Sequence, residues 1–60
     1  MNKYLRVVLT IGEVKEYEWD DVEFGSNRED DTFRVWESET GETLLVVPST
    51  NVEYYERIMR

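Results

Sequence analysis

Apolar side chains recur at every second position of this chain, in short runs divided by turn-forming residues. The first run places Leu5, Val7, Leu9 and Ile11 at alternate positions. Successive side chains of a β-strand point to opposite faces, whereas the apolar positions of a helix recur at intervals of three and four residues. Helical spacing is nearly absent from the rest of the chain as well. The pattern therefore predicts an all-β fold.

The turn-forming residues divide the chain into five predicted strands, which cover residues 3–11, 14–24, 32–37, 43–47 and 52–59. We expect a two-residue hairpin turn at Gly12-Glu13 and an exposed polar loop over residues 25–31. Gly41 suits a positive φ in the connection between the third and fourth strands. Pro48 ends the fourth strand because it cannot donate to a ladder, and residues 49–51 are expected to form a single 3₁₀ turn.

The second predicted strand changes its apolar phase. Tyr17 and Trp19 share one parity, whereas Val22 and Phe24 have the other. A period-two pattern that changes phase needs an extra residue, so we expect a β-bulge or bend at Asp20-Asp21, as in small barrels that turn a corner. Together these features predict one domain over residues 1–60, folded as a small five-stranded, strongly bent antiparallel sheet or a partly open barrel.

The order of these elements resembles the Src-homology and Sm-like barrels. The segment Leu45-Val46-Val47-Pro48-Ser49-Thr50-Asn51-Val52-Glu53-Tyr54-Tyr55 is similar to the strand, turn and strand that close many short phage and plasmid proteins. The resemblance implies an accessory protein of a phage or mobile element that blocks a host factor or sequesters a nucleotide signal of host immunity. The RNA-contacting Sm motifs, an Asp or Asn with an Arg-Gly or Lys-Gly pair, are missing, so no RNA-binding residue is carried over.

Sixty residues without cysteine or histidine limit how this domain is stabilised. A domain of this size buries only about 60% of the surface that its unfolded chain exposes. Disulfides and a thiolate or imidazole zinc site are excluded, which leaves tight packing or self-association. The lack of cysteine also fits a reducing compartment, so we expect a cytoplasmic protein of the host cell.

Charge and hydropathy argue against two classes of partner, membranes and nucleic acids. No run approaches the roughly 18 to 20 apolar residues of a membrane helix, and the first residues lack the apolar segment of a signal peptide, so no membrane association is expected. The net charge of −7 opposes attraction to nucleic-acid backbones, so direct nucleic-acid binding is not expected either.

Sorting the predicted strands by parity gives a core and a second apolar face. The predicted core comprises Leu5, Val7, Leu9, Ile11, Tyr17, Trp19, Phe33, Val35, Leu45, Val47, Val52, Tyr54 and Ile58. The opposite face carries seven further apolar or aromatic side chains, Tyr4, Val8, Trp36, Leu44, Val46, Tyr55 and Met59. Soluble monomers seldom expose such a patch, so we expect a homo-oligomer, formed through this face or by pairing of exposed strand edges. The alternative is that some of these side chains turn inward because the parity slips by one at the bulge.

We assign Tyr4, Val8, Leu44, Val46 and Met59 to the oligomer interface, and Arg6, Arg34, Trp36, Tyr55 and Arg57 to a ligand-binding or interface set. An arginine beside an exposed aromatic ring stacks a base and pairs with a phosphate, so a small nucleotide is a candidate ligand. The alternative is that the arginines neutralise facing glutamates across strands or at a subunit junction. No histidine or cysteine, nucleophile motif or glycine-rich phosphate loop is present, so we expect no enzymatic activity, cofactor or metal.

The acidic residues offer a different function. Glu16, Glu18 and Asp20, followed by Asp21, would project from one strand face at intervals of about 6.6 Å. This spacing is close to the roughly 6 to 7 Å between DNA phosphates, so the chain is also a candidate DNA mimic that inhibits a basic host protein. The alternative for these residues is a solvated face that keeps a small oligomer soluble. A third candidate function for the chain is a purely structural role as an assembly subunit.

Overall fold

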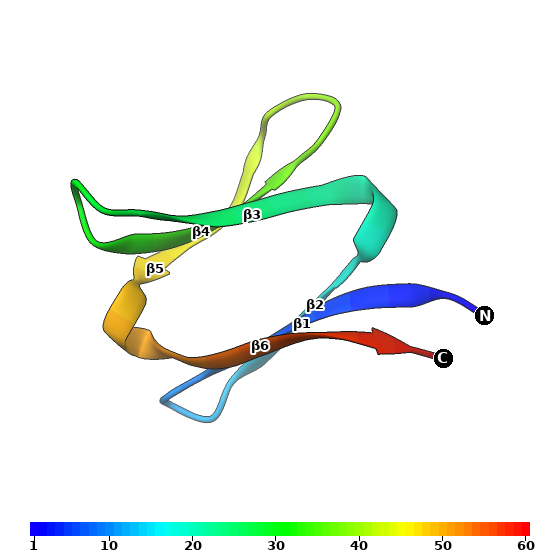
Figure 1. The fold of residues 1–60 in the computed structure, drawn as a ribbon, viewed down its shortest axis with the longest axis horizontal. Helices are drawn as coiled ribbons and strands as arrows, with labels where there is room; N and C mark the ends of the chain where they lie inside the picture. Colours follow the sequence, from blue (N-terminus) through cyan, green and yellow to red (C-terminus); the bar gives the residue numbers. More distant parts are fainter.

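The computed structural model describes all residues, 1–60, and contains six strands and two 3₁₀ turns (Figure 1). The elements in chain order are β1 (Lys3–Leu9), β2 (Val14–Glu18), η1 (Trp19–Asp21), β3 (Val22–Asn27), β4 (Thr32–Glu37), β5 (Thr43–Pro48), η2 (Ser49–Asn51) and β6 (Val52–Met59). The all-β fold is confirmed. None of the helical segments has the length or the apolar character needed to cross a bilayer.

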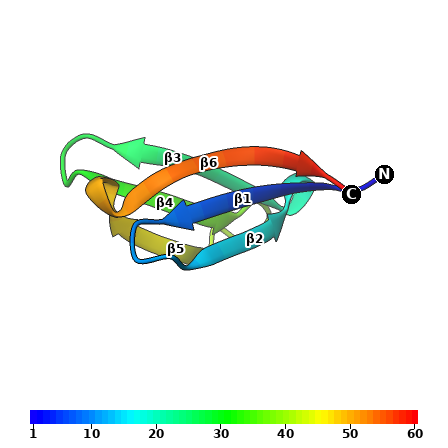
Figure 2. The same cartoon turned by 90° about the horizontal axis from the view of Figure 1, so that it is seen from below.

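The strands form two antiparallel sheets of three strands each, in the orders β2-β1-β6 and β3-β4-β5. Figures 1 and 2 show the sheets as two layers, with β3 facing β6 along one side of the molecule and β5 facing β2 along the other. The chain crosses between the layers at η1 and again at η2. Neither side is closed by pairing between the sheets, so β2, β3, β5 and β6 are all edge strands.

The predicted second strand is two strands, so the count is six and not five. The bend lies where the phase of the apolar pattern changes, but it takes up a full 3₁₀ turn, Trp19–Asp21, which moves the chain from one sheet to the other. β3 then continues to Asn27, and Gly25 and Ser26 pair with β4 although they were predicted to lie in a loop. Backbone pairing with β4 outweighs the weak strand propensity of these small polar residues.

The first hairpin has a three-residue loop and not the predicted two-residue turn. β1 ends at Leu9, whose N–H donates to the carbonyl of Glu13 at 2.8 Å, while the N–H of Gly12 donates to the carbonyl of Leu9 at 2.9 Å. Gly12 has a φ of 92°, as the left-handed position of such loops requires. Ile11 therefore lies at an exposed hairpin tip and not in the core. The expected positive φ of Gly41 is confirmed at 75°.

The core consists of five buried side chains from the two central strands. β1 contributes Leu5, Val7 and Leu9, and β4 contributes Phe33 and Val35. Partly buried apolar residues surround them: Tyr17, Trp19, Val22, Phe24, Leu45, Val47 and Val52. The predicted core is thus confirmed for β1 from Leu5 to Leu9 and for β4.

The last strand has the opposite parity to the one predicted. The register of β6 on β1 shifts between Val8, which pairs with Tyr54, and Leu9, which pairs with Val52. Glu53 is the extra residue of this bulge. It reverses the side of the sheet to which each following side chain of β6 points. No glycine marks the position, so the alternation alone did not reveal it.

Two sets of predictions in β6 are corrected by this bulge. Tyr55 and Arg57 pair with Val7 and Leu5, so they share the inner side of their sheet, and Met59 follows them. Tyr54 and Ile58, predicted as core, share the outer side with Val8 and Tyr4. The sequence left open a slip of one residue at the expected bulge of Asp20-Asp21, whereas the structure has the slip at Glu53 in the last strand.

Candidate functional site

An aromatic and aliphatic surface covers the outer side of the sheet β3-β4-β5. Trp36 and Arg34 alternate with the buried Phe33 and Val35 along β4, so they point away from the core. Val46 pairs with Arg34 and is 45% exposed, and Leu44 in the same strand is 40% exposed. We call the surface formed by Arg34, Trp36, Leu44 and Val46 the Trp36 face.

A shallow hollow of about 570 Å³ adjoins the Trp36 face at the β3–β4 hairpin. Its lining consists of Gly25, Ser26, Asn27, Arg28, Glu29, Arg34 and Trp36. The indole of Trp36 reaches toward Gly25, and its Cη2 atom lies 3.9 Å from where a Cβ of Gly25 would stand. The absence of a side chain at Gly25 therefore leaves one edge of the indole accessible from the hollow.

Arg34 is held at the wall of this hollow by Asp30 and Thr32. Its Nη2 donates to Oδ2 of Asp30 at 2.7 Å, and its Nε donates to Oγ1 of Thr32 at 3.3 Å. The Thr32 hydroxyl donates to Oδ1 of Asp30 at 2.6 Å. The hydrogen bond from Thr32 and then the one from Arg34 lower the pKa of Asp30, so the pair stays ionised at neutral pH.

Arg28 lies at the same hollow, and no acidic group forms an ion pair with it. The hollow thus combines an accessible indole edge, one oriented guanidinium and one unpaired guanidinium. These groups are suited to a flat ring that carries an anionic substituent. Arg34 and Trp36 were predicted from the sequence, whereas Arg28 was missed because residues 25–31 were expected to form a separate loop.

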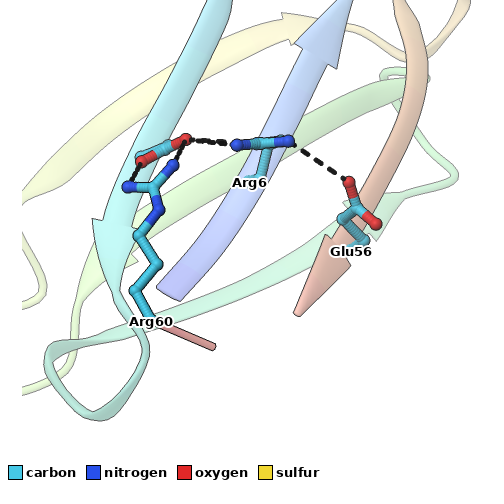
Figure 3. A network of polar contacts seen from close by, with 4 residues as sticks. Arg6, Glu56 and Arg60 are labelled. Atoms are coloured by element: carbon cyan, nitrogen blue, oxygen red, sulfur yellow. Dashed lines mark hydrogen bonds and ion pairs between the residues drawn. The ribbon is translucent and has the colours of Figure 1, made fainter. Parts of the chain in front are cut away.

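Arg6 neutralises glutamates on the neighbouring strands, which is the alternative role that the sequence left open for the arginines. On the outer side of β2-β1-β6 it pairs across the strands with Glu16 and Glu56 (Figure 3). Its Nη2 lies 3.0 Å from Oε2 of Glu16, and its Nη1 lies 3.8 Å from Oε2 of Glu56. Arg60 also binds both carboxylate oxygens of Glu16, at 2.7 and 3.0 Å. Hydrogen bonds from Arg60 and then Arg6 lower the pKa of Glu16.

The five residues predicted as a ligand-binding set do not converge in one subunit. Arg34 and Trp36 lie together, but Arg6 lies on the outer side of the other sheet. Tyr55 and Arg57 lie on the inner side of β6, at the opening between β3 and β6. The Tyr55 ring stacks on Phe33 at 5.3 Å between centroids, and the Arg57 guanidinium lies 5.6 Å from the centre of the Trp19 ring.

The residues predicted for one oligomer interface are likewise divided. Leu44 and Val46 belong to the Trp36 face, whereas Tyr4 and Val8 lie on the outer side of the opposite sheet. Met59 lies on the inner side of β6. The predicted second apolar face is therefore two faces on opposite sides of the molecule, because each sheet of a two-layer fold has an outer side of its own.

The acidic residues do not form an evenly spaced row. β2 ends at Glu18, so Asp20 and Asp21 lie in η1, and Glu16 is neutralised by arginines. A hydrogen bond with Asp21 and the charge of Asp21, followed by desolvation and the charge of Asp20, raise the pKa of Glu18. The carboxylates instead gather at the η1 end of the molecule, where Asp20, Asp21, Glu37 and Glu39 surround a depression.

Comparison with known proteins adds no relative: no family model matches this chain, and no curated protein or solved structure is detectably similar to it. The fold and its surfaces define the class as a small all-β protein of two open sheets. The resemblance to Src-homology and Sm-like barrels stays a prediction.

Proposed function

We propose that this chain is a non-enzymatic, self-associating binding protein that captures its target on the Trp36 face. One observation supports this proposal most directly: Trp36, Leu44 and Val46 lie with Arg34 on the outer side of one sheet, and Trp36 and Arg34 line a hollow that contains a second arginine. Tryptophan and arginine are the side chains that most often dominate binding energies at protein surfaces. A chain of sixty residues has no helix with which to cover them.

Self-association is supported by the balance of buried and exposed apolar side chains. Five residues are buried, whereas eight large apolar side chains are at least 40% exposed. A core of this size supplies only a few kcal/mol of stability in a chain without disulfides. Contact with a second copy would bury more apolar area and stabilise both chains by mass action.

The ligand class that fits the hollow is a small nucleotide, whose base would stack on Trp36 while its phosphate pairs with Arg34 and Arg28. Together with the resemblance to short phage and plasmid proteins, this leads us to propose an accessory protein of a phage or mobile element. It would act in the cytoplasm of a host cell, where it would inhibit or sequester a host factor such as a nucleotide immune signal.

A nucleotide panel tests this proposal. We expect at least one linear or cyclic nucleotide to raise the melting temperature of the protein, and Arg34→Ala to abolish the shift because the oriented guanidinium is lost. Arg60→Ala, which removes an arginine from the opposite sheet, serves as the control and retains the shift. Differential scanning fluorimetry measures both variants. No shift with any nucleotide would contradict nucleotide sequestration.

The acidic end supports a second candidate function. Asp20, Asp21, Glu37 and Glu39 surround a depression at η1, and the nearby Asp21 and Asp20 raise the pKa of Glu18, so the carboxylates of this end repel one another. Such an end would bind a basic host protein, as a DNA mimic does, although the evenly spaced row expected from the sequence is not formed.

Salt and charge substitutions test this second function. If the acidic end is the binding surface, the affinity for basic proteins should fall steeply between low and physiological salt. It should fall at least tenfold when Glu18, Asp20 and Asp21 become the amides. Calorimetric titration with a host DNA-binding protein measures the affinity. An affinity that responds to neither change would reject the DNA-mimic proposal.

A further inference from the structure

We propose that two copies of this chain associate through their β6 strands, paired antiparallel about a two-fold axis at Tyr55. The pairing would join the sheets β2-β1-β6 of both copies into one continuous six-stranded sheet. This inference depends on the proposed self-association, and it identifies the edge through which that association occurs.

Of the four edge strands, β6 is the one suited to pairing. It has eight residues, the most of any strand, and contains neither glycine nor proline. β2 has five residues, β3 contains Gly25, and β5 ends in Pro48. Short edges and proline discourage edge-to-edge pairing, and glycine weakens a strand, so these three strands are protected in ways that β6 is not.

The free backbone groups of β6 belong to its odd-numbered residues. Asn2 and Arg60 exchange both N–H···O bonds, at 2.7 and 2.9 Å. Hydrogen-bonded and non-bonded pairs alternate along an antiparallel ladder, so Ile58, Glu56 and Tyr54 also direct their backbone groups toward β1. Tyr55, Arg57 and Met59 direct theirs outward. A partner strand must therefore bond to these residues, and its register moves only in steps that keep odd residues opposite odd ones.

Charge selects one of these registers. With Tyr55 opposite Tyr55 of the second copy, each Arg57 lies opposite a Glu53, and this pair occurs twice by symmetry. Neither Glu53 nor Arg57 forms an ion pair within its own chain. Opposite charges directly across a strand pair are favourable and like charges are unfavourable.

The neighbouring registers are worse for stated reasons. Moving the axis to residue 56 or 57 places Glu56 opposite Glu56 or Arg57 opposite Arg57, and both are like-charge pairs. Moving the axis to residue 54 shortens the overlap to residues 52–56, because β6 begins at Val52. The register centred on Tyr55 keeps residues 52–58 paired and brings the two exposed Tyr55 rings side by side.

Charge reversal tests the register. Arg57→Glu or Glu53→Arg alone should weaken dimerisation at least about tenfold, since each creates two like-charge pairs. The double variant Glu53→Arg/Arg57→Glu should restore it. Glu42→Arg makes the same change of charge as Glu53→Arg, but in the β4–β5 loop away from β6, and should leave dimerisation unaffected. Sedimentation velocity across a concentration series gives the dissociation constants.

Cross-linking tests the position of the axis. Hydrogen-bonded antiparallel partners lie about 5.5 Å apart at Cα, a distance that a disulfide spans. The chain has no cysteine, so oxidation of Tyr55→Cys should give a covalent dimer, whereas Leu44→Cys on the other sheet should not.

The outcomes separate this inference from the proposed function. A monomer at micromolar concentration would overturn both the β6 pairing and self-association. A dimer that ignores the single reversals, or that the double variant fails to restore, would overturn the β6 pairing alone. Rapid cross-linking through Leu44→Cys in place of Tyr55→Cys would do the same and would point to the Trp36 face as the contact. The nucleotide panel with Arg34→Ala is independent of all three results.

Discussion

Phe33→Ala should lower the free energy of unfolding by about 3 to 5 kcal/mol. Phe33 is one of only five buried side chains, and its ring lies 6.2 Å from that of Phe24 and 5.3 Å from that of Tyr55, measured between centroids. Removal of the ring would leave a cavity between the two sheets. A domain of this length has roughly 3 to 9 kcal/mol of stability in total, so this loss is a large part of it.

Urea or thermal unfolding followed by circular dichroism measures the loss. Leu44→Ala is the matched control, because it also truncates a large apolar side chain but at an exposed position on the Trp36 face. We expect its effect to stay near 0.5 kcal/mol or below. Both variants should be compared at the same protein concentration, because association adds to apparent stability. Equal losses for the two variants would contradict the two-layer core.

Trp36→Ala should weaken binding at least about thirtyfold while the fold is retained. Trp36 lies on the outer side of β4 and contributes nothing to the buried core, so its loss leaves the sheets intact. At an interface, truncation of a central tryptophan costs at least about 2 kcal/mol, which corresponds to a loss of roughly thirtyfold in affinity. Isothermal titration with the nucleotide that gives the largest melting shift measures the loss, and circular dichroism verifies the fold.

Trp19→Ala is the matched control: it also replaces a tryptophan by alanine, but it should reduce stability and leave binding unchanged. Trp19 packs edge-on against Phe24 at 5.7 Å and belongs to the shell around the core. Its truncation should lower the melting temperature, and the folded fraction should keep its affinity for the nucleotide. If Trp36→Ala destabilised the protein as much as Trp19→Ala, or if it left binding unchanged, the assignment of the Trp36 face as the binding surface would be wrong.

The local elements were predictable because short-range chemistry specifies them. The third strand was predicted as residues 32–37 and the last as residues 52–59, and the structure has both at those bounds. Pro48 ends β5 and is followed by the expected 3₁₀ turn. The sequence also placed Arg34 and Trp36 on one face correctly, because residues two apart on a strand share a face.

The layers, the parity of the last strand and the composition of the site were decided by tertiary structure. Nothing in the residues 19–21 distinguishes a bulge in one strand from a turn that passes the chain to a second sheet. The bulge at Glu53 carries no signature either, because an extra residue is fixed by pairing with β1 and not by its own identity. Side chains of a strand alternate with a period of two, so one unrecognised extra residue reverses the predicted side of every later side chain. Tyr55 and Arg57 therefore lie on the inner side and not on the predicted outer side. The sequence by itself thus determined which segments are strands, whereas only packing between sheets determined which side chains remain free to bind.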